Sequence, residues 1–567
     1  MHQFLSYSFS GLATSAIYAV AAAGLVLTYT TTGTFNFAHG ATGMVAAFTY
    51  WQLRFGWHWP AAVALFVVLL ILAPLFGALL DALVMRRLEG APEATRLVVT
   101  ISVLVGLLGA ALWVWKPDAP RPVRAFYQGR FVHLAGVRVP YSQVIALLVA
   151  AAVAGGLRVL LYRLRIGIAM RAAVDDRALT RLSGARPDRG SMLAWAIGAS
   201  LAALSGILIA PTLNVSALPL TLLIVNAYAA AMIGRLRSLP MTFVGALVLG
   251  MSNEYLPDYL RKAGVGSRFL EGMYLSIPVI ILFIVLLVLP DSRLRGHQVA
   301  RGREIVPMPL LGGSLVFVAV VVAGAAMVAG VVGRADLENI SRVFGIAIIG
   351  ISLVPLVGFA GQLSLCQLSF AGIGAVVMAH AGAGGNPFGL IAAAAVAGAV
   401  GALVALPALR LSGIYLALAT GAFAVTMDRW IFPFPAFSIG HHRFDLFQEG
   451  SLTIPRPHLF ALRFDGQRAE FVLMAVGFSI CALVVVAIRR STFGARLLAM
   501  KDSPAACATL GLNVTRTKLT VFAMSAAMAG FGGALYGGAI RVAAASQFDF
   551  FTGLPILLVM VICGIGM

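Results

Sequence analysis

The segment RIGIAMRAAVDD, residues 165–176, is followed by a short polar stretch and then by a run of small apolar residues that ends at Gly206. The segment TFGARLLAMKDS, residues 492–503, begins the same succession, which ends at Gly533. Laid over one another without gaps, the two stretches pair like residues, namely Gly167 with Gly494, Asp175 with Asp502, Gly184 with Gly511, Arg189 with Arg516 and Gly206 with Gly533. This repeat indicates a chain built from two related halves.

Each copy predicts a polar loop that carries one short helix. In the second copy Ser503 is a typical N-cap, a proline follows in the first helical turn, and Gly511 fits the position just past the helix. In the first copy Asp176 takes the cap position and Gly184 closes the helix. Residues 504–510 would form a rod of roughly 10 Å. Such a rod between two spans can be gripped by another protein; the alternative is an ordinary basic cytoplasmic loop.

Composition indicates a membrane protein. Of the 567 residues, 60% are hydrophobic and 11% are charged, whereas soluble domains have about half apolar and about a quarter charged residues. Apolar runs of spanning length recur along almost the whole chain, which predicts an all-α polytopic transmembrane helical bundle of about 16–17 spans. The expected spans are 5–30, 37–53, 60–85, 97–115, 141–162, 191–211, 219–233, 240–253, 273–290, 310–332, 340–357, 364–381, 387–409, 412–430, 470–488, 518–540 and 553–567.

The net charge of +20 follows from the loops between spans. The basic residues of the first half cluster around 86–96, 158–189, 235–237 and 293–303, and alternation of the spans places all four loops on one side. The positive-inside rule makes that side the cytoplasm, so the charge does not indicate nucleic acid as a partner. The first span lacks a basic region before it, which predicts a retained span rather than a cleaved signal.

The halves have predicted boundaries. A first repeat covers 1–290, a cytoplasmic linker 291–309, an extra span 310–332 and a second repeat 333–567. The extra span returns the chain to the outside, so the two halves enter the membrane in the same sense and form parallel repeats about an axis along the membrane normal. The second repeat is expected to be C-terminally incomplete, because Met567 falls near the position that Ser238 holds in the first.

No metal site is predicted. The four cysteines, Cys366, Cys481, Cys507 and Cys563, have neither metal-ligand spacing nor a plausible disulfide framework. The outward loop 431–469 contains His441, His442, Asp445 and His458, but their loose spacing favours a solvated loop over a zinc site.

A second repeated motif joins the first two spans of each half. The sequence GTFNFAHG, residues 33–40, corresponds to GQLSLCQL, residues 361–368, so that Asn36 pairs with Ser364 and His39 with Gln367. Polar groups at a helix junction inside a membrane are costly unless they face protein or a water-filled cavity. The candidate path-lining residues are therefore Asn36, His39, Gln362, Ser364 and Gln367. The alternative is a polar clamp between helices, and a proton-titrating role for His39 is disfavoured because its counterpart is an amide.

Here the sequence resembles a known family. GLATSAIYAV at 11–20, followed by the motif at 33–40, is similar to one permease subunit of branched-chain amino-acid ATP-binding cassette (ABC) importers. VGFAGQLSL at 357–365, together with the repeated loop at 502–516, is similar to the partner permease. The resemblance covers nearly the whole chain and implies two fused permeases. The chain departs from the pattern at Leu365–Gln367, where the family usually has Gly-His, and at the GRLR of 234–237, where small residues are usual.

The resemblance implies partners and a location. In this family the permease pair forms the translocation path in the bacterial inner membrane, two ABC ATPase subunits dock on cytoplasmic coupling helices, and a periplasmic binding protein delivers the small-molecule substrate. By resemblance, the coupling helices would be 176–184 and 503–511. The residues assigned to these ATPase-coupling loops are Gly167, Asp175, Asp176, Gly184, Gly494, Asp502, Ser503 and Gly511.

The sequence offers no chemistry of its own to drive transport. It contains no phosphate-binding Gly-x-x-x-x-Gly-Lys-Ser/Thr motif, no Ser/His/Asp arrangement and no HExxH, so the chain is not expected to be an enzyme or to hold a cofactor, and ATP would be used by the partner subunits. An ion-coupled secondary transporter would need acidic residues in the membrane. Asp81 and Asp428 are the main candidates, but both lie near predicted span ends. A permease or channel for urea or short amides is the other alternative to uptake of Leu, Ile or Val.

Overall fold

The computed structural model describes residues 2–117, 120–134, 136–262, 267–288, 308–408, 411, 413–434, 437–439, 442–447, 451–457 and 466–564. The chain divides into two compact units, Met1–Val288 and Leu289–Met567. Both are bundles of helices, and the strands of the described residues form three small two-stranded sheets. The predicted all-α polytopic class is confirmed. Most of the predicted linker 291–309 lies outside the described residues.

The first unit contains helices of very different lengths. Its elements are α1 (His2–Thr32), α2 (His39–Trp51), η1 (Gln52–Gly56), α3 (Ala61–Phe66), η2 (Val67–Leu72), α4 (Ala73–Leu83), η3 (Met85–Leu88), α5 (Glu93–Val114), β1 (Phe131–Leu134), β2 (Val137–Pro140), α6 (Tyr141–Arg163), α7 (Arg165–Asp175), α8 (Arg177–Leu182), α9 (Pro187–Leu213), α10 (Ala217–Ile233), α11 (Leu239–Lys262) and α12 (Ser267–Val288).

The second unit repeats much of this order after one additional helix. Its elements are α13 (Leu311–Val331), α14 (Arg334–Ile351), η5 (Val354–Phe359), α15 (Gln367–Ala381), η6 (Ala383–Gly385), α16 (Phe388–Ala408), α17 (Ile414–Thr426), η7 (Met427–Ile431), β3 (Phe437–Ile439), β4 (His442–Phe444), β5 (Ser451–Thr453), α18 (Gln467–Arg490), α19 (Thr492–Asp502), α20 (Pro504–Thr509), α21 (Val514–Ile540), β6 (Val542–Ala544), η8 (Ala545–Phe548) and α22 (Phe550–Ile562).

Within the described residues, eleven helices are long and apolar enough to cross a membrane. Three further apolar helices are shorter: Ala217–Ile233, Ser276–Leu286 and Gln367–Ala381. Other predicted spans, among them 37–53 and 412–430, fold as shorter helices that continue directly into another helical segment, α2 into η1 and α17 into η7, and this count by length and composition does not include them. α11 differs in another way, since it continues to Lys262, past the predicted end of its span at residue 253.

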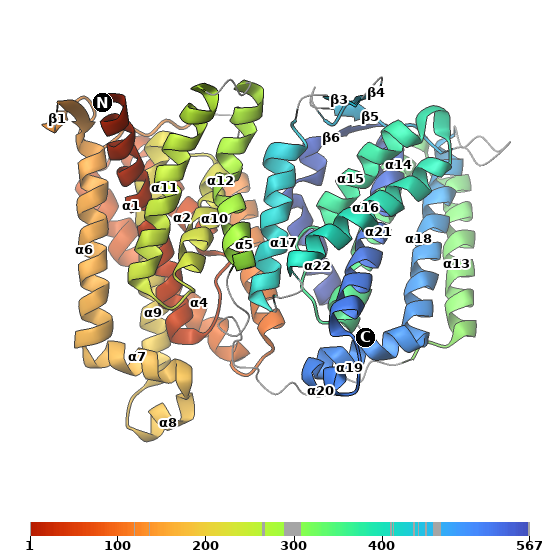
Figure 1. Ribbon diagram of the computed structural model, residues 1–567, viewed down its shortest axis with the longest axis horizontal. Helices are drawn as coiled ribbons and strands as arrows, with labels where there is room; N and C mark the ends of the chain where they lie inside the picture. The colour runs from red at the N-terminus through yellow and green to blue at the C-terminus, as the bar shows by residue number, and fades with distance from the viewer. Residues whose placement is uncertain are drawn as a thin grey trace. The chain divides into compact units, whose positions relative to one another are not determined.

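One long helix organises each unit, and it is the helix that follows the repeated loop. α9 packs against α1, α2 and α4 in the first unit, and α21 packs against α14, α15 and α16 in the second. In the first unit, α7 and α8 lie at the opposite end from β1 and the N-terminus (Figure 1). In the second, α19 and α20 lie at the opposite end from β3 and β4 (Figure 1). The repeated sequence therefore specifies a repeated packing pattern.

Small residues allow these central helices to approach their neighbours closely. A Cβ atom on Gly206 of α9 would collide with the carbonyl oxygen of Gly43 in α2. A Cβ atom on Gly533 of α21 would collide in the same way with the carbonyl oxygen of Ala371 in α15. Backbone-to-backbone contact of this kind is a typical way for membrane helices to gain packing energy. The short helices after each break are thus held directly against the central helix.

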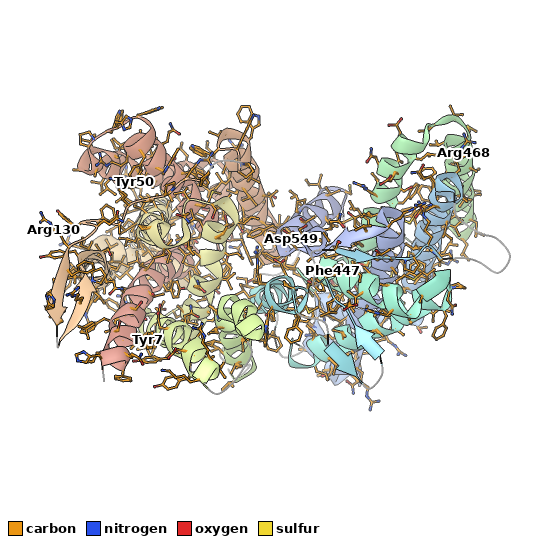
Figure 2. All side chains as sticks on the ribbon, turned by 90° about the horizontal axis from the view of Figure 1, so that it is seen from above. Tyr7, Tyr50, Arg130, Phe447, Arg468 and Asp549 are labelled. Atoms are coloured by element: carbon orange, nitrogen blue, oxygen red, sulfur yellow. The ribbon has the colours of Figure 1, made fainter. Side chains whose placement is uncertain are left out.

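The end of the second unit opposite α20 is covered by strands and aromatic rings. β5 pairs with β6 in an antiparallel ladder, and the Ile454 amide donates to the carbonyl oxygen of Arg541 at 2.7 Å. Phe447, labelled in Figure 2, meets Phe432 edge to face and Phe548 at a tilt, with ring centroids 5.4 and 5.7 Å away. Arg456, which follows the β5 strand, forms a buried ion pair with Glu470 of α18. Part of the predicted loop 431–469 is therefore fastened to the bundle.

The sequence favours a solvated loop over a zinc site at the histidines of 431–469. His441, His458 and the side chain of His442 lie outside the described residues. In the part of the chain that the structure describes, no group of three or more His, Cys, Asp or Glu side chains could hold a metal ion.

Replacing Gly206 by valine should destabilise the first unit. Overpacking of this kind costs about 1–3 kcal/mol, and the Gly43 carbonyl, being backbone, has no freedom to move aside. We expect the midpoint of thermal unfolding in detergent to fall by about 5 °C. Gly155→Val on α6 is the matched control, since a Cβ there meets nothing within 4 Å. Equal midpoints for the two variants would contradict the proposed close contact.

Candidate transport site: two capped loops and two helix breaks

The repeated loop of the first unit folds as a sharp corner followed by a capped helix. A Cβ on Gly167 would collide with the carbonyl oxygen of Leu160, so this glycine is what allows α7 to turn tightly off α6. Asp176 caps α8 by accepting from the Leu179 amide at 2.9 Å. Gly184 follows the helix with a φ of +80°, a conformation that favours glycine. The predicted cap and the predicted closing glycine are both confirmed.

The repeated loop of the second unit has the same construction. Gly494 meets the Ile488 carbonyl oxygen at the corner between α18 and α19. Ser503 caps α20 by accepting from the Ala506 amide at 3.3 Å, and Gly511 follows with a φ of +83°. The helix ends at Thr509, one residue before the predicted end. Asp502 is the exposed last residue of α19, whereas the side chain of its counterpart Asp175 lies outside the described residues.

The two capped helices expose apolar side chains. In α8, Leu179 and Leu182 are 61% and 83% exposed, and in the second loop Leu510 is 87% exposed. Cys507 of α20 faces inward and is buried. Leu179 and Leu182 are three residues apart and are therefore neighbours on the exposed surface of α8.

Ion pairs distinguish the first loop from the second. Arg177 of α8 pairs with Glu89 at 2.6 Å and with Asp188 at 2.8 Å. Arg181, one helical turn on, pairs with the same two acids at 3.8 and 3.0 Å. We call Glu89, Arg177, Arg181 and Asp188 the charge cluster. It ties α8 to the segment after η3 and to the start of α9, whereas α20, with the sequence PAACAT, has no charged residue of its own.

The sequence analysis did not identify the charge cluster. Its partners are distant in sequence, and arginines in a cytoplasmic loop are explained by membrane topology alone. The available signal was the presence of two acids, Glu89 and Asp188, within otherwise basic loops.

The break in the first unit joins α1 to α2. Gly33 follows α1 with a φ of +65°. The Asn36 carboxamide oxygen accepts from the Ala38 amide at 2.9 Å, which helps to start α2. His39 is 2% exposed and its Nε2 lies 2.9 Å from the Ala21 carbonyl oxygen, while its Nδ1 has no hydrogen-bond partner within the described ranges.

The break in the second unit joins η5 to α15. Gly361 has the same φ of +65° as its counterpart Gly33. The Gln367 amide nitrogen donates to Ser525 Oγ at 2.9 Å, and Ser525 donates to the Ser352 carbonyl at 2.6 Å. The Gln367 Oε1 atom is buried and has no hydrogen-bond partner among the residues described.

The remaining predicted residues of the second break are also buried. Ser364 Oγ lies 3.3 Å from Cys366 Sγ. Gln362 is 8% exposed, and its backbone amide donates to the Leu356 carbonyl oxygen at 3.0 Å. Ser364 and Gln367 line a small cavity together with Leu353, Leu365, Leu368, Gly553, Ile556 and Leu557. The structure therefore brings Gln362, Ser364 and Gln367 to one junction, and Asn36 and His39 to the other.

The geometry of these polar groups is compatible with both predicted roles, a clamp between helices and a lining of polar groups. His39 and Gln367 join helices through hydrogen bonds, as a clamp would, and each also presents a buried acceptor or donor that protein has not satisfied. Buried polar atoms in membrane proteins are tolerated where they face protein or a cavity. A break of this kind can therefore hold the bundle together and still bind a small polar group.

The acidic residues proposed for an ion-coupled mechanism both have fixed partners. Asp81 is 1% exposed, accepts from Ser191 Oγ at 2.5 Å, and pairs with Arg86 at 3.4 Å. Asp428 Oδ2 lies 3.1 Å from Nε of its neighbour Arg429, although neither atom has a hydrogen-bond partner among the described residues. Each of the two carboxylates therefore has an arginine from its own part of the chain within ion-pair distance.

A multi-pass helical bundle whose broken helices place polar groups inside the membrane has the architecture of a transport permease. Comparison with known proteins agrees. The family described as branched-chain amino acid transport system / permease component matches residues 7–289 and again residues 337–567. The chain belongs to this family, and it contains the permease component twice.

Three relatives each match roughly half of the chain. The high-affinity branched-chain amino acid transport system permease protein BraD of Pseudomonas aeruginosa is 26% identical over 270 residues, which is 46% of this chain and 88% of BraD. LivH of Escherichia coli is 24% identical over 311 residues, 53% of this chain and 97% of LivH. LivM of Escherichia coli is 28% identical over 260 residues, 41% of this chain and 59% of LivM. No solved structure matches the chain.

Neutralising the acids of the charge cluster should loosen α8. Each exposed ion pair contributes up to about 1 kcal/mol, which corresponds to a roughly fivefold change in a local equilibrium. In the double variant Glu89→Gln, Asp188→Asn we expect trypsin to cleave after Arg181 about fivefold faster. Raising the salt concentration should have the same effect on the unmodified chain.

The loop around α20 provides the internal control for this prediction. It contains trypsin sites at Lys501 and Arg516 but no counterpart of the charge cluster. Cleavage there should depend little on salt or on the two substitutions. Equal salt dependence at both loops would show that the ion pairs do not hold α8.

Proposed function

We propose that the chain is the transmembrane part of an ABC importer that carries branched-chain amino acids across the bacterial inner membrane. The observation that carries the proposal is the duplicated loop, which in both units forms a tight corner, a capped helix and a closing glycine. The printed names of BraD, LivH and LivM support the substrate class. The exposed leucines of the loops suit contacts with two ATPase subunits.

The energy for transport would come from these partners. The sequence has no phosphate-binding loop, so we infer that the chain carries no nucleotide or other cofactor and that ATP is consumed by the separate subunits. A periplasmic binding protein would deliver the amino acid on the outer side. Closure of the ATPases on ATP would then displace α8 and α20, and the tight corners at Gly167 and Gly494 would pass the displacement to α6 and α18.

The helix breaks would be the parts of the bundle that change conformation when α8 and α20 are displaced. An amino acid carries a charged ammonium and a carboxylate, which need donors and acceptors along any path through a membrane. The breaks supply such groups from the side chains of five residues: Asn36, His39, Gln362, Ser364 and Gln367. The apolar lining beside Gln367 would be compatible with an aliphatic side chain.

Uptake of radiolabelled leucine tests the proposal. Vesicles that contain the chain, its cognate ATPases and the binding protein should accumulate leucine when ATP is supplied, and collapse of the proton gradient should leave the rate unchanged. Transport that survives removal of ATP but stops when the gradient is collapsed would reject an ATP-driven importer. Competition by urea or short amides, with no competition by isoleucine or valine, would reject the substrate class.

Substitution of the closing glycines tests the loops. Gly184→Val and Gly511→Val place a branched side chain at φ values of +80° and +83°, a strain of about 1–2 kcal/mol that distorts the end of each short helix. We expect at least about a tenfold fall in leucine transported per ATP hydrolysed, with membrane insertion intact. The same uncoupling is expected for replacement of Asp175 or Asp502.

Gly129→Val is the matched control for strain. Gly129 has a φ of +84° and stands two residues before β1. β1 lies at the end of the unit opposite α8 (Figure 1). It should leave the transport-to-hydrolysis ratio unchanged. A ratio that is normal in both loop variants, or that falls equally in the control, would remove the coupling role.

A further inference from the structure

One side chain connects the second capped loop directly to the second helix break. Lys501 is the penultimate residue of α19 and stands two positions before Ser503, the N-cap of α20. Its Nζ atom donates to the carbonyl oxygen of Gly358 at 3.1 Å. Gly358 belongs to η5, the last helical segment before the break. The contact therefore joins two elements that are 143 residues apart in sequence.

The position of Gly358 explains why a cation is useful there. Carbonyl groups in the last turn of a helix lose their intrahelical partners and carry the negative end of the helix dipole. A lysine ammonium satisfies such a carbonyl with a charge-assisted hydrogen bond. Three residues further on, Gly361 turns the chain toward Ser364 and Gln367. Lys501 thus holds the end of the helix at the point where its direction changes.

α19 is packed firmly enough to move as one body with its lysine. Leu497 and Met500 of this helix are 0% and 2% exposed, and α19 packs against η5 as well as against α18 and α20. α20 begins directly after α19, with Ser503 as the shared boundary residue. A displacement of α20 is therefore expected to move Lys501, and with it the Gly358 carbonyl.

Among the described residues of the first unit, no hydrogen bond takes the place of this connection. The residue aligned with Lys501 is Val174, which has no donor on its side chain. The first break is contacted instead from α5, where Arg96 donates to Thr34 Oγ1 at 3.2 Å and Thr100 to the Phe35 carbonyl at 3.4 Å. The first capped helix is held by the charge cluster, which reaches the segment after η3 and the start of α9.

We propose that Lys501 is the positioning residue that transmits movement of α20 to the break at Gly361. The inference rests on the proposed function, because it needs an ATPase to move α20. In the second unit the loop then acts on the polar junction through the Lys501 bond to Gly358, beside the packing of α19 on η5, whereas in the first unit it acts on the central helix. Loss of the Lys501 contact would leave the ATPases bound and active but would disconnect them from the Gly361 break.

The buried thiol of Cys366 reports on this break. Cys366 is 0% exposed and lies between Ser364 and Gln367. In a background where Cys481, Cys507 and Cys563 are replaced by alanine, the rate of alkylation by a maleimide measures how often the break opens. The chain would be assembled with its ATPases in lipid nanodiscs, and the rate measured with and without ATP.

Three substitutions define the test. Lys501→Met removes the ammonium, and Lys501→Gln keeps a polar end that is about one bond shorter. Lys501→Arg keeps a charged donor and should restore the response. Arg496→Met is the matched control, because Arg496 is an exposed cation on the same helix. Since hydrogen bonds to charged groups are stronger than neutral ones, we expect ATP to change the alkylation rate about tenfold in the parent, Lys501→Arg and Arg496→Met proteins, and less than about twofold in the Met and Gln variants.

The outcomes separate this inference from the proposed function. If the ATPases copurify with every variant and the Met and Gln variants respond to ATP as the parent does, Lys501 has no transmitting role. An equal loss in Arg496→Met would also overturn the inference, since any cation on α19 would then suffice. If no ATPase copurifies with the parent chain, the proposed function itself is wrong.

Discussion

A peptide group inside a lipid bilayer has no water to bond with, so a helix that stops within the membrane must find partners for its free carbonyls and amides in the protein itself. This chain stops a helix in that way twice, after α1 and after η5. Both stops use a glycine with a φ of +65°. The neighbouring helices supply what the backbone lacks, with Thr100 donating to the Phe35 carbonyl and Thr420 accepting from the Leu365 amide at 3.1 Å.

Close packing against the central helices stabilises the segments that follow the two helix breaks. α2 and α15 are short, and each is pressed against a long helix through contacts that only small residues permit. The loop that precedes the same long helix carries the capped segment. One stretch of sequence therefore does two things: it forms the surface against which the broken helix rests, and it begins with the part proposed to receive an external force. This is a physical reason for the two features to be repeated together.

The sequence predicted the features that depend on local chemistry. Caps at Asp176 and Ser503, the closing glycines and the breaks at Gly33 and Gly361 all follow from residue types at fixed spacing. It gave no sign of contacts between residues far apart in sequence. The Lys501 bond to Gly358 is the clearest case, since a carbonyl acceptor is present at every residue.

The two halves attach their short capped helices, α8 and α20, to the bundle through different interactions. In the first, four charges fix a short helix to its own bundle, and exposed ion pairs are weakened by salt. In the second, the short helix is uncharged, and its connection to the bundle runs through buried apolar residues and one lysine. The two halves therefore keep the capped helix at the same place in the repeat, before the central helix, while the residues that join it to the bundle differ.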